Sequence, residues 1–354
     1  MSHVSGVQST LNLSSSSRVN GNNSIITDPL IRDYDNLFRL FYNYPPVLNS
    51  INIASAYTEC KALLTLADMY DALPVTGPRV DHHLLGFGSR LFKQIAKYPP
   101  SYLKLGYLAR SRIIFTEALI HVVGQWPAAL PHLRNGVYSP LPNSVLDLIE
   151  DKVEDLEDLK ARVESKLFRL TLTTSRGERV NPSNAYLEWL AISLFRQWLV
   201  DSTTSPPPSI LKNSPRSPNH NHRSQNPAAA ASSTLLTTSG TPGSSMSMSS
   251  PAGVYRLIGS YSTQAYLPHE ELKRFLKLHP TSSSDCLYSR DVMKRFERKM
   301  CEIKRLAREI VKPLMRNFLE LDLKGGELDG SIAIGAPPYL TCTRVEEEEL
   351  PWNL

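Results

Sequence analysis

Prolines divide the first well-patterned part of this sequence into short helical segments. From Asp28 to Pro127, apolar residues recur at intervals of three and four, which predicts three or four helices laid end to end. The clearest segment is Ile53–Leu73, and we expect Asn52 to be its N-cap and Pro74 to end it. Its apolar stripe comprises Ile53, Ala56, Tyr57, Cys60, Leu63, Leu64, Ala67, Met69 and Tyr70.

The same periodicity continues through most of the chain. It predicts a short aromatic helix around 34–42, a turn at Gly77-Pro78, and helices over 79–98, 101–123, 143–170, 182–200, 270–278 and 289–323. The last of these is expected to be the longest, with a kink or break at Pro313. Residues 339–345 alternate loosely and predict a strand. The expected fold class is therefore mainly α and multi-helical.

Composition changes sharply at two places. Residues 1–27 and 201–252 are rich in Ser, Pro, Asn and Thr, which predicts a disordered N-terminus and a flexible linker. We therefore expect helical parts at 28–135 and 140–200, and a C-terminal helical segment at 253–354 with a long basic helix and an acidic tail. Four Ser-Pro pairs in the linker are candidate phosphorylation sites: Ser205, Ser214, Ser217 and Ser250.

Composition also limits the cellular setting. The hydrophobic content of 41 % is sufficient for packed cores, and the formal charge of +5 is mild for 354 residues. The four cysteines lie without metal-ligand spacing and predict reduced thiols. No apolar run is long enough to span a bilayer and no secretion signal is apparent, so we expect an intracellular protein of the nucleus or cytoplasm, without a membrane partner.

We find no arrangement typical of catalysis. His82 and His83 are neighbours on a helix and point about 100° apart, so they are expected to be a surface pair and not metal ligands. His121 is predicted to be a core histidine bonded to backbone, and Cys60 a small core residue. No nucleophile, zinc or phosphate-loop motif is present, so we expect no enzyme, no cofactor and no metal.

Cations dominate the predicted helix at 289–323. Three interpretations are open: contact with nucleic-acid phosphates, a solvated face balanced by pairs such as Arg298–Glu302 and Arg305–Glu309, or packing against the acidic face at 147–158. We prefer the third, so nucleic acid or another acidic partner is an alternative that is not favoured. The candidate contact residues are Arg290, Lys294, Arg295, Arg298, Lys299, Lys304, Arg305 and Arg308.

Two adjacent stretches carry a family resemblance. Tyr34–Tyr42 (YDNLFRLFY) and Leu63–Tyr70 (LLTLADMY) are similar to the C-terminal half of a BTB (POZ) domain. The remaining helical sequence, notably 91–98, 121–127, 167–198 and 288–319, resembles the long C-terminal region of a group of fungal BTB proteins.

The resemblance implies a non-enzymatic module that binds other proteins, with a role in transcriptional regulation. An alternative it implies is a substrate adaptor of a cullin-type ubiquitin ligase. The elements that usually build the BTB homodimer would precede Asp28, where this sequence is rich in Ser and Asn. Homodimerisation and cullin binding are therefore not carried over.

Overall fold

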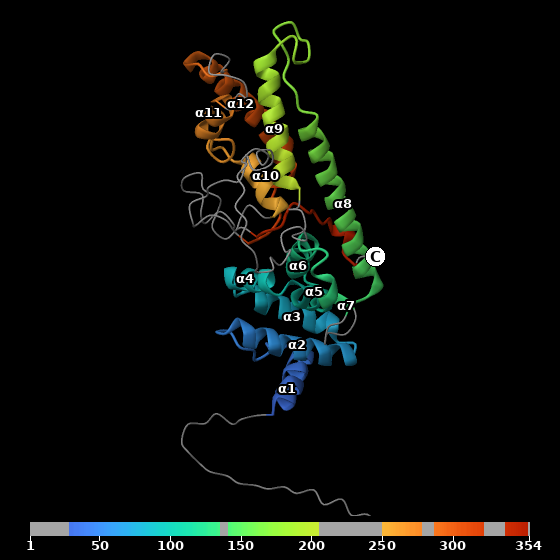
Figure 1. The fold of residues 1–354 in the computed structure, drawn as a ribbon. Helices are drawn as coiled ribbons and strands as arrows, with labels where there is room; N and C mark the ends of the chain where they lie inside the picture. Colours follow the sequence, from blue (N-terminus) through green and yellow to red (C-terminus); the bar gives the residue numbers. More distant parts are fainter. Residues whose placement is uncertain (1–27, 135–140, 205–249, 278–286, 322–336, 353–354) are drawn as a thin grey trace, which may run out of the picture.

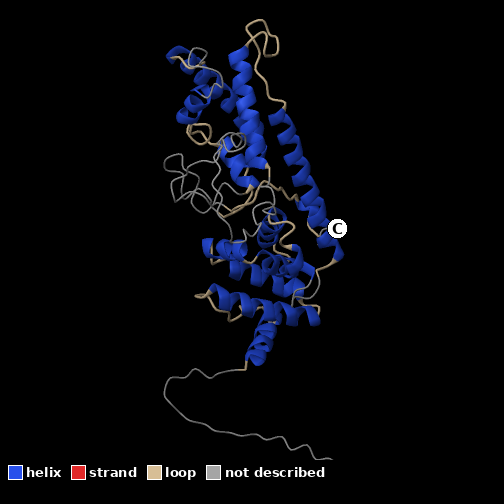
Figure 2. Cartoon of the chain, in the orientation of Figure 1, coloured by secondary structure: helices blue, strands red, loops and turns tan. Residues whose placement is uncertain are grey.

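Helices make up the regular structure of this chain. The computed structural model describes residues 28–134, 141–204, 250–277, 287–321 and 337–352, and Figure 2 shows no strand among them. One isolated antiparallel bridge joins Thr173 to Arg179. The helices are α1 (Pro29–Phe41), α2 (Ile53–Met69), α3 (Leu73–Leu85), α4 (Ser89–Lys97), α5 (Pro99–Ala109), α6 (Arg112–Gly124), α7 (Leu130–Arg134), α8 (Asn143–Phe168), α9 (Tyr186–Thr203), α10 (Pro251–Gly259), α11 (His269–Lys277) and α12 (Arg290–Val311).

Two apolar cores organise these helices. The first core is formed by α1–α7 and the beginning of α8, with Leu63, Leu64 and Phe115 among its fully buried side chains. The second core is formed by the end of α8 and by α9–α12, around Phe195, Tyr255 and Phe296. In Figure 1, α8 runs beside both cores. Its 26 residues give it a length of about 39 Å.

The C-terminal residues also connect the cores. Leu340 and Cys342 are buried in the second core, whereas Leu350 is buried in the first. The Trp352 ring lies edge-on to the Phe115 ring, with centroids 5.2 Å apart. Residues 339–345, predicted to form a strand, have no regular structure, because among the described residues no neighbouring strand supplies a backbone ladder.

Several predicted helix ends are confirmed by their caps. The Asn52 side chain accepts hydrogen bonds from the backbone of Ala54 and Ser55, and Ser289 accepts one from Val292 at the start of α12. The helix expected from residue 182 begins later, because the Asn181 side chain accepts hydrogen bonds from Ser183 and Asn184 in a turn. The helix α9 starts only at Tyr186.

The predicted turn at Gly77-Pro78 is wrong. Both residues lie inside α3, where the helix crosses α5 so closely that a Cβ on Gly77 would lie 2.6 Å from the carbonyl oxygen of Ala109. Glycine is thus required here by close helix packing and not by a turn.

Two helices that were predicted as continuous are broken. The segment 79–98 divides between α3 and α4 at Gly86–Gly88, and 101–123 divides between α5 and α6 at Arg110, which adopts a left-handed conformation (φ 50°). Ser111 then caps α6. The break lets α5 and α6 pack face to face, and a Cβ on Gly106 would lie 2.7 Å from the backbone nitrogen of Phe115.

The ends of the later helices also differ from expectation. Helix α12 ends at Val311, followed by a 3₁₀ helix, η2 (Lys312–Met315), because Pro313 cannot continue the α-helical hydrogen bonds. With 22 residues it is shorter than α8. Helices α9 and α10 extend into the predicted linker at 201–203 and 251–252. The predicted disordered stretch 1–27 lies outside the described residues, as does the linker between 205 and 249.

Phe195 and Trp189 provide a test of the second core. Phe195 is fully buried, whereas Trp189 is only half-buried. We expect Phe195→Ala to lower the free energy of unfolding by about 3–5 kcal/mol, and Trp189→Ala by clearly less, because less of its surface leaves water. Urea unfolding of both variants measures the difference, and equal losses would contradict this placement of α9.

Candidate functional site

The eight candidate cations of α12 fall into two groups. Five are exposed on the helix surface: Arg290, Lys294, Arg295, Arg298 and Arg305. The other three make contacts within the fold, and the burial of Lys304 contradicts its assignment as a partner contact. Lys299 is half-buried with its ammonium 3.1 Å from Glu302, and Arg308 donates to the carbonyl of Ser260 and lies over the Tyr261 ring.

Lys304 is the most deeply buried of the eight. Its ammonium donates to the carbonyl oxygens of Thr263, Tyr266 and Leu267, at 2.6, 2.6 and 3.1 Å. Burial lowers the pKa of Lys304 to about 8. The lysine therefore holds the loop between α10 and α11 against α12 and is inaccessible to a partner.

The predicted i,i+4 pairs of α12 are replaced by pairs at spacing three. Glu302 lies against Lys299, and Glu309 lies 3.6 Å from the ammonium of Lys312. Arg298 and Arg305 are consequently left without an ion pair to any residue that the structure describes.

The preferred interpretation, in which the acidic face of α8 packs against α12, is wrong. The acidic residues at 147–158 are exposed, and most of them lie on the half of α8 that packs on the first core. Helix α12 belongs to the second core, where α8 supplies the apolar side chains of Val163 and Leu167. The charge on the first half of α8 and the charge on α12 are thus separated along the length of α8.

Ser250 is the one predicted phosphorylation site among the described residues. Its hydroxyl accepts a hydrogen bond from the backbone of Gly253, so it is the N-cap of α10. Ser205, Ser214 and Ser217 lie outside the described residues.

His83 and Cys60 make contacts within the fold. His83 Nε2 lies 2.9 Å from the carbonyl oxygen of Asn49, which links α3 to the loop before α2. Cys60 is fully buried, and burial raises its pKa to about 12. No group of three potential metal ligands occurs among the described residues.

Glu117 and His121 form a buried polar cluster that sequence analysis did not find. His121 was expected to bond to backbone, but its Nδ1 lies 2.8 Å from the Tyr339 hydroxyl, which also accepts from the Gln125 amide. The Glu117 carboxylate accepts from the backbone nitrogens of Glu320 and Leu321, at 2.7 and 3.2 Å. His121 Nε2 and Glu117 Oε1 are 3.8 Å apart. Only the tertiary structure brings these partners together, since they are about 200 residues apart.

Burial shifts the titration of both groups. It raises the pKa of Glu117 to about 7, although the two backbone hydrogen bonds oppose this shift, and it lowers the pKa of His121 to about 4. Both side chains are 1 % exposed. The polar atoms are largely satisfied by backbone and by Tyr339, so the cluster attaches the C-terminal segments to α6.

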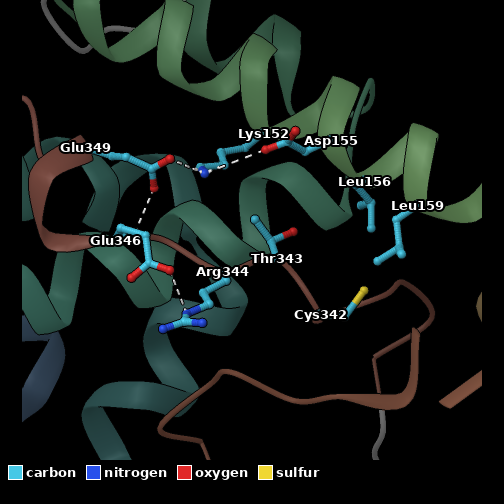
Figure 3. A pocket seen from close by; sticks show the side chains of 9 residues that line it. All are labelled: Lys152, Asp155, Leu156, Leu159, Cys342, Thr343, Arg344, Glu346 and Glu349. Carbon is cyan, nitrogen blue, oxygen red and sulfur yellow. Dashed lines mark hydrogen bonds and ion pairs between the residues drawn. The ribbon is translucent and has the colours of Figure 1, made fainter. Parts of the chain in front are cut away.

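A second cluster of polar side chains lies where the C-terminal tail meets α8. A pocket of about 330 Å³ is lined by Lys152, Asp155, Leu156, Leu159, Cys342, Thr343, Arg344, Glu346 and Glu349 (Figure 3). Lys152 pairs with Glu349 and Asp155, and Arg344 pairs with Glu346. Burial would raise the pKa of Glu349, but hydrogen bonds from Lys152 and from the Glu346 backbone outweigh it and lower that pKa. The charged side chains of the pocket therefore satisfy one another.

An exposed apolar face covers one side of α1. Five side chains make up this α1 face: Leu30, Ile31, Phe38, Phe41 and Tyr42, each between 48 % and 75 % exposed. At 100° per residue they fall within an arc of about 120°, next to the buried side that carries Leu37 and Leu40. A contiguous exposed patch of this kind is typical of an interaction site.

No family model, curated protein or solved structure matches this chain. The resemblance to a BTB domain therefore stays a prediction. No helix among the described residues is both long and apolar enough to cross a membrane.

The buried pair Glu117 and His121 leads to a prediction about pH. Glu117 remains protonated up to a pKa of about 7 in place of 4.5, so its contribution to stability is lost as pH rises from 4.5 through 7. His121 remains neutral down to a pKa of about 4 in place of 6.5, so its contribution is lost as pH falls from 6.5 through 4. In the wild type these two effects largely cancel between pH 4.5 and 6.5.

Single variants separate the two effects. Because only the His121 contribution remains in Glu117→Gln, this variant is expected to lose stability as pH falls from 6.5 towards 4, whereas His121→Asn keeps only the Glu117 contribution and should lose stability as pH rises from 4.5 to 7. Each change is on the order of 2–3 kcal/mol. Urea unfolding between about pH 4 and pH 8 measures it. Three parallel profiles would refute the roles given to these residues.

Proposed function

We propose that this protein is a non-enzymatic scaffold inside the cell that binds other proteins, and that a partner docks on the α1 face. The observation that carries the proposal is the exposure of Phe38, Phe41 and Tyr42 beside a core that leaves them uncovered. Aromatic side chains in a desolvated contact contribute disproportionately to binding energy.

The surroundings of the α1 face suit a helical partner. Phe38 and Phe41 lie edge to face, with ring centroids 6.3 Å apart, and the Tyr34 and Tyr70 rings lie 6.2 Å apart where α1 meets α2. The ion pair Asp35–Arg39, at 2.8 Å, borders the face with charge. An apolar centre with a charged border fits the apolar side of an amphipathic helix.

The BTB resemblance also supports protein binding, since it lies in α1 and α2, includes the residues 38, 41 and 42 of the α1 face, and implies an interaction module. A role in transcriptional regulation belongs to the same proposal. The cullin-adaptor alternative differs in one observable, because it requires a cullin among the partners that purify with the chain.

The proposal predicts that Phe38→Ser/Phe41→Ser removes partners without unfolding the chain. Tagged wild-type and variant chains are purified from the protein's own cells after nuclease treatment, and the proteins recovered with them are quantified by mass spectrometry. We expect at least one stoichiometric partner to fall about tenfold or more with the double variant, which corresponds to about 1.4 kcal/mol.

Phe168→Ser provides the control, because Phe168 is 57 % exposed on α8, away from the α1 face. It should leave the same partners in place. Unchanged partners in the double variant, with its circular dichroism preserved, would contradict the proposal. Light scattering of the purified wild type shows whether the partner is a second copy.

A further inference from the structure

Four cations of α12 form an exposed stripe with no partner in the described part of the chain. Arg290, Lys294, Arg298 and Arg305 define this α12 stripe, at successive spacings of four, four and seven residues. These spacings place them within an arc of about 80° on the helix. None makes an ion pair or hydrogen bond to another described residue, whereas Lys299, Lys304, Arg308 and Lys312 all do.

The acidic residues of α12 do not neutralise the stripe. Glu297 pairs with His269, Glu302 with Lys299, and Glu309 with Lys312. These three carboxylates are thus engaged by groups outside the stripe. The fourth acidic residue of α12, Asp291, is exposed and pairs with no described residue, so the four cations of the stripe outnumber it. This arrangement is the opposite of a surface balanced by i,i+4 pairs.

We infer that the α12 stripe binds the phosphate backbone of a nucleic acid, independently of base sequence. From Arg290 to Arg305 the stripe is about 22 Å long, and a duplex presents one phosphate charge for about every 1.7 Å of its axis. Each cation therefore meets a phosphate along this length. Three of the four are arginines, whose guanidinium groups bind phosphate oxygens in a two-pronged geometry.

The surroundings of the stripe favour nucleic acid over a lipid surface. A helix that lies on a membrane inserts an exposed apolar side. The apolar side of α12 is instead buried in the second core through Met293, Phe296, Met300 and Ile303. The stripe contains no aromatic residue that could stack on bases, so contacts to backbone phosphates dominate.

The test is a titration of the purified full-length chain into a labelled random-sequence DNA duplex of about 20 base pairs and the matching single-stranded RNA. Four phosphate contacts predict a slope of log affinity against log salt of about −3.6 for the duplex, between about 50 and 200 mM salt. Arg298→Glu/Arg305→Glu should weaken binding about tenfold or more and reduce the slope by about 2.

Lys93→Glu/Lys97→Glu is the matched control. Both lysines are exposed on α4 in the first core, and the pair changes the net charge by the same amount. It should leave affinity and slope nearly unchanged. Equal weakening by both double variants, or no binding to either nucleic acid at low salt, would overturn the inference.

Cys301 gives a direct readout of the contact. It is exposed between Arg298 and Arg305, whereas Cys60 and Cys342 are buried. In a Cys286→Ser background, a photo-crosslinker on Cys301 should crosslink to the duplex, and this should be lost in Arg298→Glu/Arg305→Glu. Absence of a crosslink in the Cys286→Ser chain would count against the stripe.

Two further probes, anionic lipid vesicles and polyglutamate, distinguish nucleic acid from other acidic partners. Binding to anionic lipid vesicles or to polyglutamate, with none to DNA or RNA, would reject nucleic acid as the ligand. The Phe38→Ser/Phe41→Ser variant should bind nucleic acid like the wild type, so the inference can fail or succeed independently of the proposed scaffold role.

Discussion

The carboxylate of Glu117 accepts hydrogen bonds from two backbone N–H groups of the segment that follows α12, and this contact joins the two cores. It places the segment that follows the last helix of the second core directly on α6 of the first core. Tyr339 adds a second attachment through His121 and Gln125, and a Cβ on Gly124 would lie 2.5 Å from the Tyr339 ring. Arg256 of α10 donates to the carbonyls of Pro337 and Tyr339 from the other side. Buried polar groups of this kind favour one arrangement of the two cores, because each group left without a hydrogen-bond partner costs free energy.

The attachment of the two cores fixes the positions of the α1 face and the α12 stripe relative to each other. The α1 face belongs to the first core and the α12 stripe to the second, and in Figure 1 they lie towards opposite ends of the described chain. With both cores held along α8 and by the C-terminal tail, a protein bound at one end and a nucleic acid bound at the other would keep a defined relation. The proposed scaffold role and the inferred phosphate contact are therefore compatible in one molecule.

Local chemistry explains which parts of the fold were predictable. The mainly α class, the extent of α8, and the caps Asn52 and Ser289 follow from apolar periodicity and from side chains that satisfy the first N–H groups of a helix. The errors occur where distant residues intervene. Gly77 resembles a turn residue but allows α5 to approach, and the break at Arg110 depends on the packing of α5 against α6.

The candidate site residues also divide into features that the sequence predicts and features that only the fold reveals. Sequence identified the cations of α12, but only the fold separated Lys304, which is held by three carbonyls, from Arg298 and Arg305, which have no partner among the described residues. The acidic face of α8 looked complementary in charge, yet it is exposed and does not lie against α12. The sequence by itself determined the helices and their apolar sides, because these depend on neighbours within a few residues. The tertiary structure alone decided which polar groups meet, since burial and pairing depend on residues up to about 200 positions away.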